Sequence, residues 1–283
     1  MCTTRLRKRV TGSCIALLVI VLATVGWRRR KTAQDVAELR QVATTRREGT
    51  FSEEDLEGLP TPVYAYLDTV LQEGQPYIDS VYLEQTGKLR PGDAASPWKP
   101  FAATQYVTVD PPGFVWDASV SLAPFVSVRV RDQFHDWAGT ANVSLFGVVP
   151  LEGDDSSSEL DEAALMRYLA EAVWYPTALL PTAGVEWESI DKRTAKATIE
   201  NGDVSASVTF SFTENNEVAH VSADRYRHVD GGYEVTPWSG YWRNYETRNG
   251  VRVPTAGDVV WHLRDGDMHA WTGHVTKLRY NEL

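Results

Sequence analysis

The longest amphipathic helix pattern in the chain runs from about Glu159 to Trp174. Its apolar residues recur at helical spacing and form one stripe: Leu165, Leu169, Ala172 and Val173. Ser158 stands where an N-cap residue is expected, and Pro176 prevents the helix from continuing. We therefore predict one long helix here, followed by an apolar loop that ends at Pro181.

Alternation of apolar and polar residues predicts strands on both sides of this helix. Before the helix, one face of a predicted strand carries only apolar residues: Phe114, Trp116, Ala118, Val120 and Leu122. After it, residues 204–212 alternate between apolar side chains and Ser or Thr. One face of each strand is thus polar, which favours antiparallel pairing.

Turn dipeptides divide the C-terminal part of the chain into hairpins. They supply residues suited to positive φ angles: Asn201-Gly202, Asn215-Asn216, Gly231-Gly232, Asn249-Gly250 and Asp265-Gly266. Turns at the first two would pair apolar residues: Ile199 with Val204, Ala197 with Ala206, Phe212 with Ala219 and Phe210 with Val221. We predict an antiparallel meander of six or seven strands over residues 185–280.

Together these patterns predict an α+β fold with a strongly bent, half-barrel-like antiparallel sheet. The helix at 159–174 should pack on the concave or apolar face of that sheet. A second helix is expected to begin at Thr61-Pro62 and to end at Gly74. The predicted organisation is a membrane anchor with basic flanks (1–31), a juxtamembrane stalk (32–59) and one α+β domain (60–283).

The N-terminal segment has the length and composition of a transmembrane helix. Residues 10–27 are eighteen consecutive residues without a charge, and Arg28-Arg29-Arg30 follow directly. A cleavable signal peptide is the alternative, but Ala23-Thr24-Val25 fits a cleavage site poorly. We expect an uncleaved single-pass anchor. The basic residues on its two sides differ little in number, so the side on which the domain lies stays open.

The charge of the chain excludes one class of partner. The first 31 residues hold eight of the 28 basic residues and no acid; removing them leaves a net charge of −18 for residues 32–283. Such a surface repels phosphate backbones, so nucleic acid is not expected as a partner. An acidic surface with few lysines suits a halophilic protein, and an ordinary acidic protein is the alternative.

The sequence indicates no metal or cofactor site. Both cysteines, Cys2 and Cys14, precede Trp27, so the rest of the chain has no disulfide or thiolate ligand. A two-residue turn at Asp265-Gly266 would place His262 opposite His269. Two imidazoles need a further ligand to bind a divalent metal, and none is evident. A cross-strand polar pair is the preferred interpretation.

Several motifs resemble a prokaryotic family of unknown function. They are D-P-P-G-F-V-W-D-A at 110–118, R-Y-L-A-E-A-V-W-Y-P-T-A-L-L-P at 167–181, V-E-W-E-S-I-D at 185–191, G-V-R-V-P-T at 250–255 and W-H-L-R-D-G-D at 261–267. The resemblance implies an N-terminal membrane segment and a β-rich C-terminal domain, and lends no catalytic residues. A bent sheet under helices is also similar, as an architecture only, to the lipoprotein-carrier half-barrels, which shield acyl chains.

The candidate site follows from the aromatic residues and one ion pair. Trp174 ends the long helix beside the apolar loop, and Arg167 and Glu171 form an i,i+4 pair on it. Trp238 and Trp242 belong to an aromatic segment of a predicted strand. We expect these five residues to line a site for an apolar or amphipathic, lipid-like ligand, without catalysis. A protein-interaction scaffold at the membrane and a membrane-tethered hydrolase are the alternatives.

Overall fold

The computed structural model describes residues 26, 30–41, 49–147, 149–154, 156–229 and 231–282. Apart from Gly26, the expected anchor at residues 10–27 lies outside this part. Within the described residues, no helix combines the length and the apolar character needed to cross a membrane.

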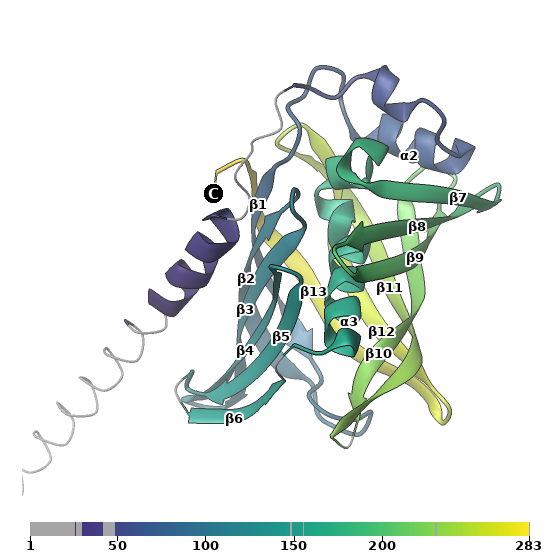
Figure 1. The fold of residues 1–283 in the computed structure, drawn as a ribbon. Helices are drawn as coiled ribbons and strands as arrows, with labels where there is room; N and C mark the ends of the chain where they lie inside the picture. Colours follow the sequence, from purple (N-terminus) through teal and green to yellow (C-terminus); the bar gives the residue numbers. More distant parts are fainter. Residues whose placement is uncertain are drawn as a thin grey trace, which may run out of the picture.

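Thirteen antiparallel strands of the described chain form one open sheet (Figure 1). Six precede the long helix: β1 (Ser80–Leu89), β2 (Lys99–Thr108), β3 (Gly113–Ala123), β4 (Val126–His135), β5 (Ala138–Leu145) and β6 (Val149–Asp154). Seven follow it: β7 (Val185–Asp191), β8 (Thr194–Asn201), β9 (Val204–Phe212), β10 (Val218–Val229), β11 (Gly232–Arg248), β12 (Val251–Leu263) and β13 (Gly266–Tyr280). Each group is a meander, and β1 pairs with β13 to join the two. The sheet edges are β6 and β7. The predicted meander of six or seven strands over residues 185–280 is confirmed, with seven strands.

Helix α3 (Ser158–Glu171) connects the two edges and packs against strands of both meanders, mainly β9, β5 and β10. Figure 1 shows it in the hollow of the bent sheet, which confirms the predicted concave position. Its N-cap is Ser157 and not Ser158, because the Ser157 side chain accepts a hydrogen bond from the Leu160 amide. The last predicted turn is the short 3-10 helix η2 (Ala172–Trp174). Two further 3-10 turns, η3 (Pro176–Leu179) and η4 (Pro181–Ala183), form the apolar loop.

The core lies between α3 and the concave face of the sheet. The predicted stripe of α3 and η2 is fully buried: Leu165, Leu169, Ala172 and Val173. It meets the inward residues of both meanders, among them Phe114, Phe134 and Phe210. Each large side chain buried in this way contributes about 1.5–3 kcal/mol. Because the sheet is bent, the inward faces of both meanders contact α3 and bury its apolar residues.

Two hairpin registers differ from the sequence predictions. Phe210 pairs with Val221 as predicted, but Phe212 pairs with Val218, since a bulge displaces Ala219. Ile199 pairs with Ala206 and not with Val204. This slip of two residues keeps both apolar faces on the same side of the sheet.

The predicted histidine pair is wrong. In the β12–β13 hairpin, His262 faces Asp267 and His269 faces Val260, so the tight turn lies one residue earlier than expected. Among the described residues there is no cluster of three or more metal-ligating side chains.

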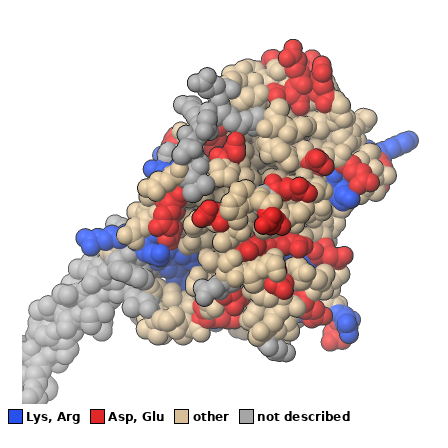
Figure 2. Space-filling view, viewed as in Figure 1, with Lys and Arg blue, Asp and Glu red and all other residues tan. Residues whose placement is uncertain are grey.

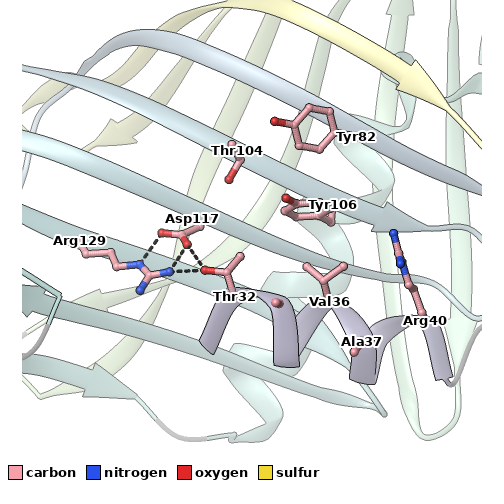
Figure 3. A pocket seen from close by; sticks show the side chains of 10 residues that line it. Thr32, Val36, Ala37, Arg40, Tyr82, Thr104, Tyr106, Asp117 and Arg129 are labelled. Carbon is pink, nitrogen blue, oxygen red and sulfur yellow. Dashed lines mark hydrogen bonds and ion pairs between the residues drawn. The ribbon is translucent and has the colours of Figure 1, made fainter. Parts of the chain in front are cut away.

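The N-terminal segment packs on the domain. Residues 30–41 form a helix on the convex face of the sheet, outside β2–β4 (Figures 1 and 3). The 3-10 helix η1 (Glu53–Leu56) precedes α2 (Thr61–Val70), which begins with Pro60 as N-cap and ends before Gly74 because Leu71 is extended. Phe51 and Leu56 are buried in the core. The packed unit thus includes residues that we expected to form the stalk.

The surface shown in Figure 2 is acidic. Asp and Glu side chains are spread over this face, and Lys and Arg occupy few places on it. This agrees with the net charge of residues 32–283. The dependence of the protein on salt stays a prediction.

Candidate functional site

A cavity of about 260 Å³ lies between α3 and the concave face of the sheet. Five tryptophans, four charged residues and several apolar residues line it: Gln85, Leu89, Trp116, Val130, Asp132, Arg167, Glu171, Trp174, Arg225, Trp238, Trp242, Val259, Ala270 and Trp271. All five residues proposed from the sequence are in this set. The structure thus brings together Arg167, Glu171 and Trp174 of α3 and η2 with Trp238 and Trp242 of β11. Their role in binding stays a prediction.

Glycines on neighbouring strands make room for the aromatic rings. Trp242 pairs with Gly257, Gly257 with Gly273, and Gly273 with Gly87, across four adjacent strands. A Cβ atom on Gly257 would lie 2.8 Å from the Trp242 ring, and one on Gly273 would lie 2.4 Å from the Trp271 ring. The rings of Trp242 and Trp271 therefore pack directly against the glycine backbone, where any larger residue would place its Cβ atom in the ring. These glycines, which the sequence interpretation did not include, were visible as interruptions of the strand pattern.

The indole groups differ in their hydrogen bonds. Trp174 Nε1 donates to the Pro254 carbonyl at 3.0 Å, and Trp116 Nε1 donates to Gln85 Oε1 at 2.8 Å. The buried Nε1 atoms of Trp238 and Trp242 have no acceptor among the described residues. Trp174 and Trp242 meet edge to face, with ring centroids 5.0 Å apart. The Trp174–Trp242 pair thus joins η2 to the sheet at the cavity wall.

Arg167 holds two carboxylates at the same wall. Its Nη1 lies 2.6 Å from Asp132 of β4, and its Nε donates to Glu171 at 2.8 Å. Burial alone would lower the pKa of Arg167, but Glu171 and Asp132 outweigh it and raise that pKa. Burial raises the pKa of Asp132, and Arg167 and Arg225 only partly oppose this. The predicted pair of Arg167 and Glu171 is therefore part of a fixed triad, and no local pattern in the sequence pointed to Asp132 as its third member.

Arg225 of β10 is the second cation of the cavity, and the reasoning from sequence missed it. Its Nε donates to the Ala163 carbonyl of α3 at 3.1 Å. Its guanidinium carbon lies 5.5 Å from the centroid of the Trp238 ring and 5.6 Å from that of Trp261. Burial, together with Arg167, lowers the pKa of Arg225 to about 10. The sequence did contain one indication of its place: Arg225 follows Val221 and Ala223 at every second position of β10 and so lies on the same, inward face.

A second, larger hollow of about 780 Å³ lies on the convex face, under the helix at residues 30–41. Figure 3 shows Thr32, Val36 and Arg40 of that helix facing Tyr82, Tyr106 and Asp117 of the sheet. Asp117 contacts both Arg129 and the Thr32 hydroxyl. Burial opposes ionisation of Asp117, but these partners prevail and lower its pKa. Here the charged groups fix the helix to the sheet.

A Ser–His–Asp chain also lies on the convex face. Ser239 Oγ is 2.8 Å from His262 Nε2 and 3.0 Å from His220 Nε2, and His262 Nδ1 is 2.7 Å from Asp267. Ser239 is buried and pairs with a neighbouring strand on either side. The backbone amides of a central strand bond to its neighbours, so β11 itself offers no pair of free backbone donors for an oxyanion.

The comparisons with known proteins identify a family and a solved structure to which the chain is similar. The model of the family of unknown function DUF6544 matches residues 49–273, in agreement with the resemblance of the motifs. Among solved structures, a LolA superfamily protein from Nitrosomonas europaea is 14% identical with a TM-score of 0.34. That match covers 78% of this chain and 93% of the other. No curated protein matches the sequence.

Proposed function

The chain belongs to the family of unknown function DUF6544, and we propose that it binds a small apolar or amphipathic ligand, without catalysis, in the cavity beneath α3. The observation that carries this proposal is the tryptophan-lined cavity itself. About 260 Å³ corresponds to roughly nine water molecules at ~30 Å³ each. Ligand sites are concave and mostly apolar with a few placed polar groups, and this partly open cavity has that composition.

The proposed setting of this function is a membrane. The apolar segment at residues 10–27 would anchor the chain by one pass and hold the cavity beside a source of lipid-like molecules. The side of the membrane on which the domain works stays open. The support for this setting comes from the sequence alone.

Native mass spectrometry of the full chain, purified from its own membranes, tests ligand binding. We expect a co-purifying small molecule. Val259→Phe, which fills the cavity from β12, should remove it. Val235→Phe places the same ring at an exposed position of β11 and is the matched control. A wild-type chain without any bound molecule, or a molecule that Val259→Phe retains, would contradict the proposal.

A scaffold function is the second candidate, because several apolar side chains are exposed near hairpin ends. Phe125 is fully exposed between β3 and β4, and Phe146 is 43% exposed between β5 and β6. Contacts with a partner would bury such residues. Phe125→Ser combined with Phe146→Ser should then abolish capture of that partner and leave ligand binding in the cavity unchanged.

The hydrolase alternative has weaker support. The Ser239 chain has suitable distances, but it lies on the convex face, away from the tryptophan-lined cavity. Its place on a central strand also leaves it without free backbone donors of that strand for an oxyanion. Ser239→Ala should therefore leave ligand binding in the tryptophan-lined cavity unchanged.

A further inference from the structure

Arg225 is held in place by groups that leave its charge unpaired. The Ala163 carbonyl takes the Nε proton, and the rings of Trp238 and Trp261 lie beside the guanidinium. Among the described residues, no carboxylate lies within ion-pair distance of it, and its terminal nitrogens have no acceptor. The side chain of Arg225 is thus fixed at the cavity wall, and its two terminal nitrogens have no hydrogen-bond acceptor there among the described residues.

Three arginines of low exposure have carboxylate partners, whereas Arg90 and Arg227, which are half-buried like Arg225, have none among the described residues. Arg129 contacts Asp117, and Arg131 lies 2.6 Å from Asp35. Arg167, on the same cavity wall, has two carboxylate partners. A cation in a low-dielectric site is costly unless an anion or several acceptors compensate it. Arg225 is half-buried, and Asp132 and Glu171 act on it only from beyond ion-pair distance. Its terminal nitrogens can therefore donate to a further negative group in the cavity.

The surroundings of Arg225 indicate the kind of negative group. A guanidinium fork matches a carboxylate in a bidentate, planar arrangement. Asp132 and Glu171 lie on the wall of the same cavity and would repel a doubly charged phosphate more strongly than a singly charged carboxylate. Leu89, Val130 and Val259 offer apolar surface for the remainder of the ligand.

We infer that the ligand of this cavity is an amphiphile with a carboxylate head, which pairs with Arg225, and an alkyl chain that lies against the tryptophans. The inference rests on the proposed function and specifies its ligand class. At neutral pH the arginine is charged, because its pKa of about 10 is well above that range. The head group would thus replace water at the terminal nitrogens of a side chain that is already positioned.

Quenching of tryptophan fluorescence by brominated probes tests the inference. The full chain in lipid nanodiscs is titrated with ω-bromoundecanoic acid and with ω-bromoundecanol, which has the same chain and no charge; empty nanodiscs give the blank. We expect the acid to bind about ten- to a hundredfold more tightly, the range for hydrogen bonds to a charged group. Arg225→Met should reduce acid binding to the level of the alcohol, and Arg225→Lys should retain part of the preference.

Arg193→Met removes an exposed arginine paired with Glu214 and is the matched control, with both affinities unchanged. Equal affinities of the wild type for acid and alcohol would overturn the carboxylate inference and leave ligand binding standing. A preference for the acid that persists in Arg225→Met would overturn it too. Binding of neither probe would count against the proposed function itself. If Arg225→Met does not fold, Arg225→Gln and the wild-type ratio of the two affinities decide the question.

Discussion

The two faces of the sheet hold arginines in opposite ways. On the convex face, Arg129 and Arg131 of β4 meet carboxylates from β3 and from the helix at residues 30–41. On the concave face, Arg225 of β10 lies among tryptophans with no carboxylate partner among the described residues. Arg129 and Arg131 thus join parts of the chain on the convex face. On the concave face Arg167 joins α3 to β4, but the terminal nitrogens of Arg225 stay available.

The volumes of the two hollows do not indicate their roles. The convex hollow is the larger, about 780 Å³ against about 260 Å³, but its charges already serve to dock a helix. The smaller cavity has an aromatic wall and an arginine whose terminal nitrogens are unused. The satisfaction of buried charges, more than volume, therefore distinguishes a packing interface from a candidate binding site.

The largest expected effect is on the convex face. Asp35→Ala should leave Arg131 buried without its partner and weaken docking of the helix at residues 30–41 by about 3–5 kcal/mol. Hydrogen exchange of that helix should then become much faster. Glu38→Ala, at an exposed position of the same helix, is the control and should change little. Unchanged protection in Asp35→Ala would show that the ion pair does not hold the helix.

A double variant sharpens this test. Asp35→Leu together with Arg131→Met replaces both charges by apolar groups of similar size. Because a buried ion pair can be exchanged for apolar contacts at little cost, docking should largely recover. If the double variant exchanges as fast as Asp35→Ala, the loss must come from something other than the unpaired charge.

A smaller difference is expected between two tryptophans of the concave face. Trp174→Phe removes the donor to the Pro254 carbonyl, whereas Trp242→Phe removes an N–H without an acceptor among the described residues. Denaturant titration of the full chain should show that Trp174→Phe costs about 1–3 kcal/mol more free energy of unfolding than Trp242→Phe. Equal costs would mean that the Trp242 N–H is in fact satisfied.

The smallest expected effect concerns pH. Burial, together with His262, lowers the pKa of His220 below 6.5, so the folded protein favours the neutral ring. This contribution to stability is complete above about pH 6.5 and is lost as the pH falls through the lowered pKa. His220→Gln should therefore reduce the slope of unfolding free energy between about pH 7 and pH 5. Parallel slopes in the two proteins would contradict the assignment, and Arg225, which stays charged over this range, should not contribute.

Local periodicity by itself determined much of this protein. The helical spacing of Leu165 and Leu169 identified α3 and its buried face, and alternation identified the strands and their inward sides. The same parity places Trp238 and Trp242 on one face of β11. Because side-chain direction along a helix or strand depends only on local backbone geometry, the sequence was sufficient for these features. It was therefore also sufficient to propose five residues that prove to share one cavity.

Only the tertiary structure decided which residues of different strands became neighbours. The slip in the β12–β13 hairpin separated His262 from His269, because turn geometry and bulges set the register. Contacts between segments distant in the chain also decided the partners of charged residues. Asp35 pairs with Arg131, whereas Arg225 donates to the Ala163 carbonyl and has no carboxylate within ion-pair distance among the described residues. Gly257 makes room for the Trp242 ring only because β12 pairs with β11, whereas Gly273 and Trp271 are near neighbours on the same strand. Charge pairing and close packing depend on such long-range neighbours, and no local pattern of residues specifies them.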